Sequence, residues 1–528
     1  MTRCRILYIH GLVGTGSILP IGVARISNFL KSKKGLSQGD IEEEILCLFY
    51  EDLPPFSFEN VGNYRSKLRC LLQATYEMFN FDVVAISCFA STFYKISLEI
   101  AFTIKSITNS NSITVIGGVH PTVCPEDFSP DEIPEYFYEF YSREFVPVNF
   151  VIRGEAEIGF YKLIKRLLNK DDASNKYKNT FNIVTSELID DLSTIPLLDL
   201  RLYEKYKLQI SNNSELSIES NRGCPYQCTF CIPSMKDLGF YNKYRIKPIP
   251  LFFKELYYLK EEGWLNANVL NLGDPLFYPM RKMREQFFKQ LSLLKRNIGF
   301  DNTIAIHERV DICSLTDLEN FKKLNIWTEF GLESVSVEVL RLMNKTNSPN
   351  VQTYHDYLHK THLLIEALDK FDALGAISII SGFPGSTKKQ YNDFREFFFK
   401  KTNGKSIMEK YNVNLRFMWY NLLPSANSLH LKCEKELGSR FFFKKWWKEF
   451  NSHSRLFGWF LKPSQTLSFE KYITETSQIM NEVFIVQEEK GNKFYSGGDL
   501  AGLDATRYNN STKRLKTLFT LYPELSQA

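Results

Sequence analysis

Short apolar runs alternate with amphipathic stretches over the first 190 residues of the chain. Runs rich in β-branched residues predict strands, and apolar residues spaced three or four positions apart predict helices. Strands are predicted at residues 5–9, 42–48, 83–87, 113–116 and 150–153, and helices at residues 20–31 and 96–107. Strands that alternate with helices form a mostly parallel, doubly wound sheet. Residues 1–190 are therefore predicted to be an α/β domain of the Rossmann-like type.

A second series of alternating elements begins near residue 208. Its strands are predicted at residues 216–219, 269–272, 303–306, 327–332, 376–380 and 415–422, and its helices include residues 280–294 and 391–400. Six strands in this order predict an open, partial (β/α)6 barrel over residues 208–425, with its chemistry at the carboxyl ends of the strands. Residues 191–207 lose the periodicity and are predicted to be a linker. We expect residues 426–528 to form a small, mostly helical domain that caps the substrate site.

The composition excludes several classes of protein. Hydrophobic residues make up 44% and charged residues 24% of the 528 positions, which is typical of a globular chain and excludes a disordered one. With 65 basic against 60 acidic residues the net charge is +5, so no nucleic-acid partner is expected. No run of about 18 apolar residues occurs, and the apolar start at residues 6–9 continues into His10 without a signal-peptide cleavage site. We therefore expect a cytoplasmic protein without a membrane span.

Three of the ten cysteines lie within eight residues, directly after the first predicted barrel strand. They are Cys224, Cys228 and Cys231, in the segment NRGCPYQCTFC. Three thiolates can hold three irons of a [4Fe-4S] cluster and leave the fourth iron open to a small molecule. A structural zinc site would need a fourth ligand, which is absent nearby. Buried thiols without a metal are the other alternative.

The cysteine spacing, with Phe230 before the last cysteine, resembles the signature of the radical S-adenosylmethionine (SAM) enzymes. Four further segments resemble motifs of that family in the same order. They are LNLGDPLF (270–277), GLESVSVEVLRLMNKTNSP (331–349), SGFPGST (381–387) and NLLPSANSL (421–429). The resemblance implies that the three cysteines bind the cluster and that SAM chelates its open iron. The residues implied to bind SAM are Phe230, Gly273, Asp274, Arg309, Glu333, Ser334, Gly382, Pro384 and Leu422.

The N-terminal domain makes a second resemblance, to the cobalamin-binding domain of cobalamin-dependent radical SAM enzymes. The segments that carry it are PIG (20–22), VVAISCFAST (83–92), VIGGVHPT (115–122) and VIRGEAE (151–157). The implied cobalamin-binding residues are Pro20, Gly22, Ser87, Cys88, Phe89, Ser91, Thr92, Gly117, Gly118, His120, Gly154 and Glu155. The Asp-x-His-x-x-Gly motif that supplies a histidine to cobalt in many other cobalamin domains is absent. Cobalamin is therefore expected to bind without such a histidine, its lower face against the loop after Ser87.

Together the two resemblances imply a cobalamin-dependent radical SAM methyltransferase that methylates an unactivated carbon of a natural-product or peptide substrate. In such a reaction a 5′-deoxyadenosyl radical removes hydrogen from the substrate, and methylcobalamin supplies the methyl group. The resemblance also implies an external electron donor, a flavodoxin or a ferredoxin, and it identifies no catalytic side chain. Two alternatives stay open: rearrangement, oxidation or cyclisation without methyl transfer, and a cobalamin-binding sensor with a vestigial cluster. A methylthiotransferase is disfavoured because the N-terminal half has no second three-cysteine group.

Two other clusters of side chains allow a functional and a structural interpretation. His355, His359 and His362 share one helical face and could hold a metal, but the absence of an adjacent glutamate motif favours a solvated face. The basic and aromatic segment 440–448, with Lys444, Lys445 and Lys448, could grip an aromatic or anionic substrate. An amphipathic helix with lysines extended over an apolar surface is the favoured interpretation.

Overall fold

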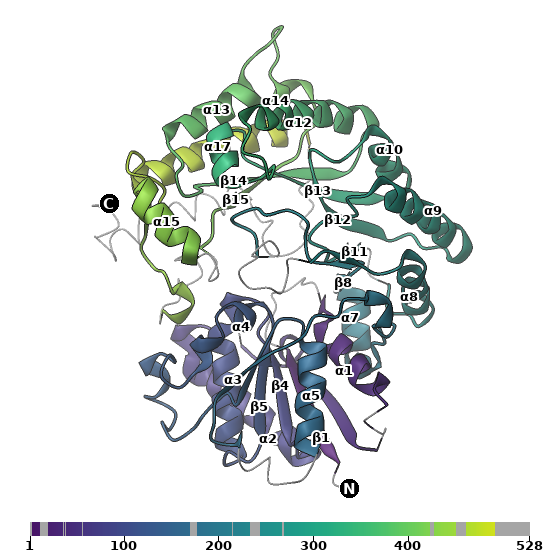
Figure 1. Ribbon diagram of the computed structural model, residues 1–528, viewed down its shortest axis with the longest axis vertical. Coiled ribbons are helices and arrows are strands. Elements are labelled where there is room, and N and C mark those ends of the chain that lie inside the picture. The colour runs from purple at the N-terminus through teal and green to yellow at the C-terminus, as the bar shows by residue number, and fades with distance from the viewer. Residues whose placement is uncertain are drawn as a thin grey trace. The chain divides into compact units, whose positions relative to one another are not determined.

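The computed structural model describes residues 3–10, 19–34, 36, 39–54, 56–168, 177–213, 215–232, 243–266, 269–422, 427–449 and 461–491. The chain divides into two compact units, each described here by itself (Figure 1). Unit 1 comprises residues 1–217, 245–267 and 445–455, and unit 2 comprises residues 218–244, 268–444 and 456–528. Both units are therefore assembled from segments that are far apart in the sequence. Among the described residues, no helix has the length and apolar character needed to cross a membrane.

Unit 1 is built on a parallel sheet of six strands. In spatial order these are β3 (Ile41–Cys47), β1 (Cys4–His10), β4 (Val83–Ser87), β5 (Ile113–Gly117), β6 (Phe150–Arg153) and β7 (Asn182–Thr185). Residues Ile6 to Ile9 of β1 have no exposed surface, as expected for a parallel strand that is covered on both faces. The predicted doubly wound sheet is thus confirmed, and β7 is an additional strand that the sequence pattern did not indicate.

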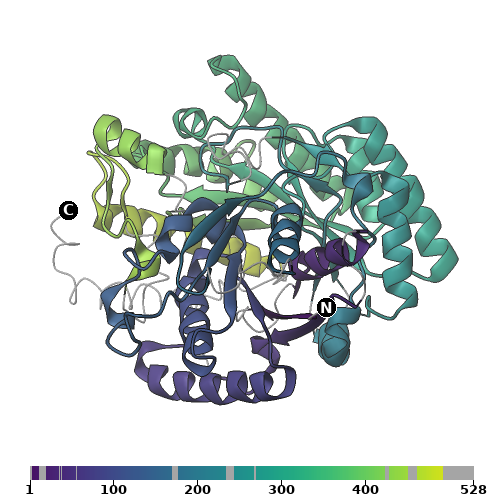
Figure 2. The ribbon, with the colours of Figure 1, turned by 60° about the horizontal axis from the view of Figure 1, so that its bottom comes forward.

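Two pairs of helices pack on this sheet (Figure 2). The pairs are α1 (Gly22–Ser32) beside α5 (Ala156–Leu168), and α2 (Val61–Phe79) beside α3 (Tyr94–Ile107). The strand order changes direction at β1, because β3 lies on one side of it and β4 on the other. In open α/β sheets the ligand crevice lies at the carboxyl ends of the strands, at such a switch point. The loop after β4 is therefore at the edge where a ligand is expected.

Unit 2 is built on the second parallel sheet, which has the predicted order. In spatial order its strands are β8 (Leu216–Ile218), β11 (Val269–Leu272), β12 (Thr303–Arg309), β13 (Ile326–Glu333), β14 (Gly375–Ser381) and β15 (Leu415–Trp419). The two-residue strand β2 (Leu19–Pro20), which the sequence pattern did not indicate, pairs with the start of β8. The outer helices are α9 (Arg281–Ile298), α10 (Leu315–Lys323), α12 (Val351–Phe371) and α13 (Lys388–Phe399) (Figure 1). This arrangement confirms the predicted α/β class with a parallel-sheet core.

The C-terminal segment adds helices to unit 2. Helix α17 (Phe469–Glu489) packs against α13 and the short α14 (Ile407–Lys410). It follows an insertion that contains α15 (Asn427–Leu437), β16 (Arg440–Phe441) and β17 (Leu461–Lys462). The amphipathic helix favoured for residues 440–448 is wrong: these residues form strand β16 and a single 3-10 turn, η11 (Trp446–Lys448).

Candidate functional site

The cysteine loop, residues 224–231, follows β8 and the two-residue strand β9 (Asn221–Arg222). Burial raises the pKa of Cys231, the neighbouring thiols of Cys228 and Cys224 raise it further, and Lys345 opposes them. The two other thiols of the loop and the positive charge of Lys345 thus both act on Cys231. This is the loop in which the sequence predicts the cluster ligands.

Backbone and side-chain hydrogen bonds fasten the cysteine loop to the segment that follows α11 (Val337–Leu342). The amide of Thr229 donates to the carbonyl of Met343 at 3.0 Å, and the amide of Gln227 donates to Asn347 Oδ1 at 3.1 Å. Sequence reasoning did not single out these anchors, although they lie within the resembling segments NRGCPYQCTFC and LMNKTN. The anchors explain how a loop without regular structure keeps three cysteines together.

Glu333 ends β13 and forms a buried ion pair with Lys345, whose Nζ lies 2.9 Å from Glu333 Oε1. Both side chains are less than a tenth exposed. Glu333 adopts a φ of 71°, a left-handed conformation that is uncommon for a residue other than glycine and costs free energy. A Cβ on Gly331 would lie 2.5 Å from Glu333 Oε1, so the glycine leaves room for the carboxylate. Strained residues of this kind cluster at ligand sites.

Arg309, at the end of β12, reaches the cysteine loop. Its guanidinium bonds Asp311 through Nε and Nη2 at 2.9 and 3.0 Å, and Nη2 donates to the carbonyl of Lys345 at 2.7 Å. The guanidinium carbon lies 3.8 Å from the ring centroid of Tyr226, which stands between Cys224 and Cys228 in the sequence. Arg309 therefore joins the third strand to the loop that carries the thiols.

Asp274, after β11, holds the segment that leads into the cysteine loop. Its Oδ1 accepts hydrogen bonds from the amides of Ser220 at 2.7 Å and Asn221 at 3.0 Å, and its Oδ2 bonds the Ser220 hydroxyl. Burial raises the pKa of Asp274 to about 7, although these hydrogen bonds oppose the shift. The neighbouring Gly273 donates its amide to the carbonyl of Ile218 at 2.8 Å. Both residues thus fix the path from the first strand to Cys224.

The remaining predicted SAM residues lie around the carboxyl ends of β13 to β15. Phe230 packs edge-on against Phe383 with ring centroids 6.4 Å apart. Ser334, Pro384 and Leu422 are buried. Residues 423–426 of the predicted NLLPSANSL motif lie outside the described residues.

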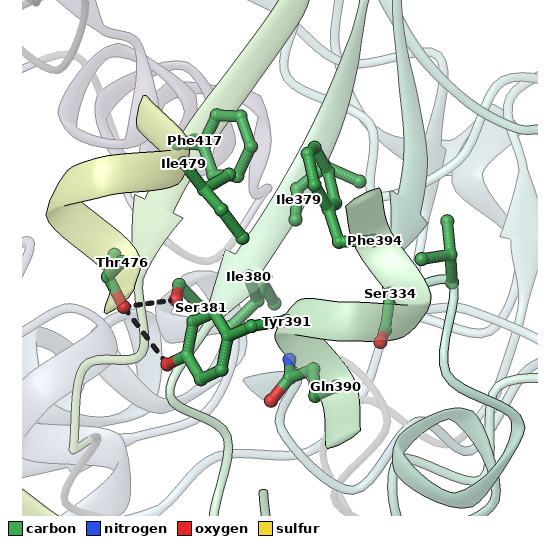
Figure 3. Close-up of a pocket in the computed structure, with 11 residues that line it drawn as sticks. Ser334, Ile379, Ile380, Ser381, Gln390, Tyr391, Phe394, Phe417, Thr476 and Ile479 are labelled. Carbon is green, nitrogen blue, oxygen red and sulfur yellow. Dashed lines mark hydrogen bonds between the residues drawn. The ribbon is translucent and has the colours of Figure 1, made fainter. Parts of the chain in front are cut away.

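Helix α17 supports the SGFPG loop, which contains Gly382. Gly382 has a φ of 76°, and a Cβ there would lie 2.1 Å from Cε2 of Tyr472. The Thr476 hydroxyl contacts Ser381 Oγ at 2.7 Å and the Tyr391 hydroxyl at 3.0 Å (Figure 3). These three side chains line a small pocket that also includes Ser334. Sequence reasoning missed Tyr472 and Thr476, because they lie some ninety residues beyond the motif that they support.

The predicted cobalamin residues lie mostly at the carboxyl edge of the unit 1 sheet. Ser87 and Gly117 end β4 and β5, and the Cys88 amide donates to the Gly117 carbonyl at 2.8 Å. Gly118 has a φ of 120°, and a Cβ there would lie 2.5 Å from the Cys88 carbonyl oxygen. Phe89, in contrast, is 49% exposed. The loops after β4 and β5 thus touch each other and present an aromatic ring outward.

Other residues of the predicted cobalamin set make contacts within unit 1. Pro20 lies in β2 (Leu19–Pro20), which pairs with the start of β8, and Gly22 begins α1 with open space where a Cβ would stand. The Gly154 amide donates to Thr122 Oγ1 at 3.0 Å. Both oxygens of Glu155 bond the Arg245 guanidinium, which also donates to the Ile189 carbonyl at 2.8 Å. Thr92, Ser91 and His120 lie in the loops after β4 and β5, with Ser91 Oγ 3.0 Å from His120 Nδ1.

The donor set of the cysteine loop fits a cluster better than a single ion. Among the described residues, no three His, Cys, Asp or Glu side chains are grouped as ligands of one metal ion. Thiolates of a [4Fe-4S] cluster bind separate irons and need not converge on one point.

The three histidines of α12 lie on a solvated helix face, as favoured from the sequence. His355 and His359 are exposed, and His362 lies 3.7 Å from Glu366.

The edge of unit 1 fits a flat apolar ligand with polar substituents. Small residues at Gly22 and Gly117 leave space beside the backbone, and Phe89 offers an exposed ring. The expectation that cobalamin binds without an Asp-x-His-x-x-Gly histidine rests on the sequence alone and stays a prediction.

Residues 218–398 match the family model of the radical SAM superfamily. The chain thus carries a radical SAM domain at residues 218–398, as the resemblance of its cysteine spacing and following motifs predicted. Its fold is similar to that of the radical SAM methyltransferase TsrM from Kitasatospora setae, solved with cobalamin and a [4Fe-4S] cluster, with a TM-score of 0.58, 13% identity and coverage of 83% of this chain and 80% of that one. It is also similar to the cobalamin-dependent SAM radical enzyme OxsB, with a TM-score of 0.53, 16% identity and coverage of 82% and 61%.

Curated relatives match over shorter stretches. An uncharacterized methyltransferase of Pyrococcus horikoshii is 24% identical over 323 residues, which span 59% of this chain and 62% of the relative. The anaerobic magnesium-protoporphyrin IX monomethyl ester cyclase of Synechocystis is 27% identical over 175 residues, or 31% and 30% of the two chains. The ribosomal protein uS12 methylthiotransferase of Clostridium novyi is 26% identical over 204 residues, or 38% and 43%. The alignments thus cover less than two thirds of each of these relatives.

Proposed function

We propose that this chain is a cobalamin-dependent radical SAM methyltransferase that methylates an unactivated carbon of a natural product or peptide. The observation that carries the proposal is the presence, in one chain, of an anchored three-cysteine loop in a radical SAM domain and a doubly wound sheet with a ligand edge. The fold shared with TsrM and OxsB over more than four fifths of this chain supports it.

The chain's own residues have distinct roles in this proposal. Cys224, Cys228 and Cys231 would hold the [4Fe-4S] cluster, and Lys345 places a positive charge near two of these thiols. Glu333, held by Lys345 in a strained conformation, would face SAM. When bound, the cluster and SAM supply a hydrogen-abstracting radical and cobalamin supplies the methyl group. The protein positions these groups and excludes water.

Product stoichiometry tests the proposal. Anaerobically reconstituted enzyme, given hydroxocobalamin, SAM, a reductant and substrate, is expected to form 5′-deoxyadenosine and S-adenosylhomocysteine in about equal amounts, because one SAM supplies the radical and another the methyl group. S-adenosylhomocysteine without deoxyadenosine would contradict hydrogen abstraction. A flavodoxin or ferredoxin should replace the chemical reductant.

A second candidate is a cobalamin-dependent radical reaction without methyl transfer. The match to a cyclase of Synechocystis favours it, because that relative is named for ring formation and not for methylation. Deoxyadenosine without S-adenosylhomocysteine would identify this outcome. A methylthiotransferase stays disfavoured despite the match to such a relative, because the N-terminal cysteines 4, 47, 70, 88 and 124 are dispersed.

A further inference from the structure

Three polar side chains form a chain at the carboxyl edge of the unit 1 sheet, next to the switch point. Ser91 lies in η3 (Ser91–Phe93), after β4, and His120 lies in α4 (Val119–Val123), after β5. Ser91 Oγ is 3.0 Å from His120 Nδ1, within hydrogen-bond distance, and His120 Nε2 lies 3.5 Å from Asp127 Oδ2, an electrostatic contact without hydrogen-bond geometry. The histidine is 1% and the aspartate 4% exposed, whereas Ser91 is half-buried at the edge.

The histidine ring has one orientation and one charge state in this environment. It packs against Tyr94, Phe128 and Trp447, with ring centroids 5.3, 5.7 and 5.4 Å away. Burial lowers the pKa of His120, although Asp127 opposes this shift, so the imidazole is neutral at neutral pH. Because Nε2 faces the carboxylate of Asp127, we assign the ring proton to Nε2 and leave Nδ1 to accept the Ser91 hydroxyl hydrogen. The lone pairs of Ser91 Oγ are then available to a ligand.

The aspartate is held by residues from more than 300 positions further along the chain. Trp447 Nε1 donates to Asp127 Oδ2 at 2.7 Å, and Lys448 Nζ lies 2.8 Å from Oδ1. Lys448 and Lys445 also pair with Glu132, at 2.9 and 2.8 Å. Burial would raise the pKa of Asp127, but the nearby His120 and Lys448 side chains lower it to about 2. Lys445 and Lys448 of the basic and aromatic segment therefore belong to unit 1, where their positive charges keep the buried Asp127 carboxylate ionised.

We propose that Ser91, His120 and Asp127 form a polar relay that makes Ser91 Oγ an acceptor for a donor group of a bound corrinoid. Trp447 and Lys448 act as positioning residues for Asp127. The inference rests on the cobalamin part of the proposed function. It follows from the place of Ser91 in the loop beside the switch point, with exposed Phe89 as its apolar neighbour. A buried carboxylate behind a neutral histidine fixes the tautomer and orientation of the ring.

Equilibrium titration of the anaerobic full-length protein with hydroxocobalamin, followed by its visible absorbance, tests the relay. Ser91→Ala is expected to raise the Kd for hydroxocobalamin about tenfold, because one hydrogen bond in a partly buried site contributes about that much to the affinity. The matched control Ser142→Ala, at an exposed serine of the same unit, should leave the Kd unchanged. If the wild-type protein binds hydroxocobalamin and Ser91→Ala binds it equally tightly, the relay is refuted and the proposed function stands. If the wild type binds none, the cobalamin assignment fails first.

A double-mutant cycle separates a relay from a purely structural effect. His120→Phe keeps an aromatic ring among Tyr94, Phe128 and Trp447 but removes the acceptor for Ser91. It should raise the Kd several-fold when residue 91 is serine and have no further effect in the Ser91→Ala background, because the histidine acts through the hydroxyl. Additive losses would refute the relay. Should His120→Phe fail to fold, His120→Asn, which retains an acceptor near the Nδ1 position, should bind more tightly than Ser91→Ala, and weaker binding would count against the relay.

Discussion

At the scale of single residues, the cysteine loop depends on neighbours that are not ligands themselves. Lys345 pairs with Glu333 and acts electrostatically on Cys224 and Cys231, and Arg309 contacts the Tyr226 ring and the Lys345 carbonyl. Positive charges near a cluster that carries negative charge affect its assembly and its reduction potential. The motif residues of the radical SAM domain are therefore connected to one another, and a change in one of them is expected to affect the others.

The three clustered cysteines are expected to be necessary for iron binding. Cys224→Ala, Cys228→Ala and Cys231→Ala should each reduce iron from about four per chain to a small fraction and abolish SAM cleavage, because each thiolate binds a separate iron. Iron and sulfide analysis after anaerobic reconstitution measures this. Cys313→Ala, which removes a thiol outside the loop, is the control and should retain the full iron content. One zinc and no iron in the wild type would contradict the assignment.

Gly331→Ala should disturb the Glu333–Lys345 ion pair. The added Cβ would lie 2.5 Å from Glu333 Oε1 and 3.2 Å from Lys345 Nζ, and the pair is too enclosed to move freely. We expect a loss of about 1–3 kcal/mol in the free energy of unfolding, as for other overpacked sites. Urea unfolding followed by circular dichroism measures it. Gly62→Ala, in α2, where a Cβ would meet nothing within 4 Å, should cause no loss.

At the scale of elements, α17 supports a loop that belongs to a motif far earlier in the chain. Tyr472 packs on Gly382 and Thr476 joins Ser381 to Tyr391, so one helix face contacts both the end of β14 and α13. The same helix packs against α13 and α14. The SGFPG loop is thus positioned by C-terminal residues outside the matched radical SAM segment.

Thr476→Val should loosen this support. Valine has nearly the same shape but removes the hydroxyl and leaves Ser381 and Tyr391 without their shared partner. Loss of buried hydrogen bonds of this kind costs about 1–3 kcal/mol. Thermal unfolding by calorimetry should show a lower Tm for this variant. Thr474→Val changes an exposed threonine of the same helix and should leave the Tm as in the wild type; an equal decrease in both variants would contradict the proposed role.

At the scale of the whole molecule, each compact unit contains segments from distant parts of the chain. Helix α8 (Ile249–Glu261) belongs to unit 1, where Glu255 pairs with buried Arg25 and Lys247. Residues 445–455 also belong to unit 1. We infer that unit 1 requires these later segments to complete its packing. The predicted boundaries at residues 190, 207 and 425 stay predictions.

The stability of the molecule is expected to fall in mild acid because of His10. This side chain is 2% exposed and 2.6 Å from the Tyr203 hydroxyl, and burial lowers its pKa from 6.5 to about 4. Because the unfolded chain binds the proton more readily, the contribution of His10 is complete above pH 6.5 and is lost as the pH falls toward 4. The loss reaches roughly 3 kcal/mol at most.

Urea unfolding between pH 7 and pH 4 measures this effect. His10→Gln should show a flatter decline of stability across this window than the wild type, because glutamine takes up no proton. His355→Gln, at an exposed position of α12, is the control and should decline as the wild type does. A wild-type midpoint that is constant from pH 7 to pH 4 would exclude a buried neutral histidine at this position.

Local patterns in the sequence determined the elements and the chemistry. Apolar periodicity placed the strands of both sheets within a few residues of their observed bounds, because a parallel strand must be apolar on both faces and a covering helix on one. The spacing of Cys224, Cys228 and Cys231 indicated the cluster, because three thiols so close in sequence share one loop wherever that loop lies. Strand β7 was missed, because its residues are alternately half-buried and exposed and carry a weaker apolar signal.

Only the tertiary structure decided which distant residues support these sites. Trp447 and Lys448 hold Asp127, Tyr472 packs on Gly382, and Arg245 pairs with Glu155. The two members of each pair are about 90 to 320 residues apart in the sequence. A local sequence pattern carries no information on which distant charge or ring a given side chain will contact. The segment 440–448 shows the same limit. Its lysines and aromatics suit a helix by periodicity, but the partners available to them in the folded units favour a short strand and one turn.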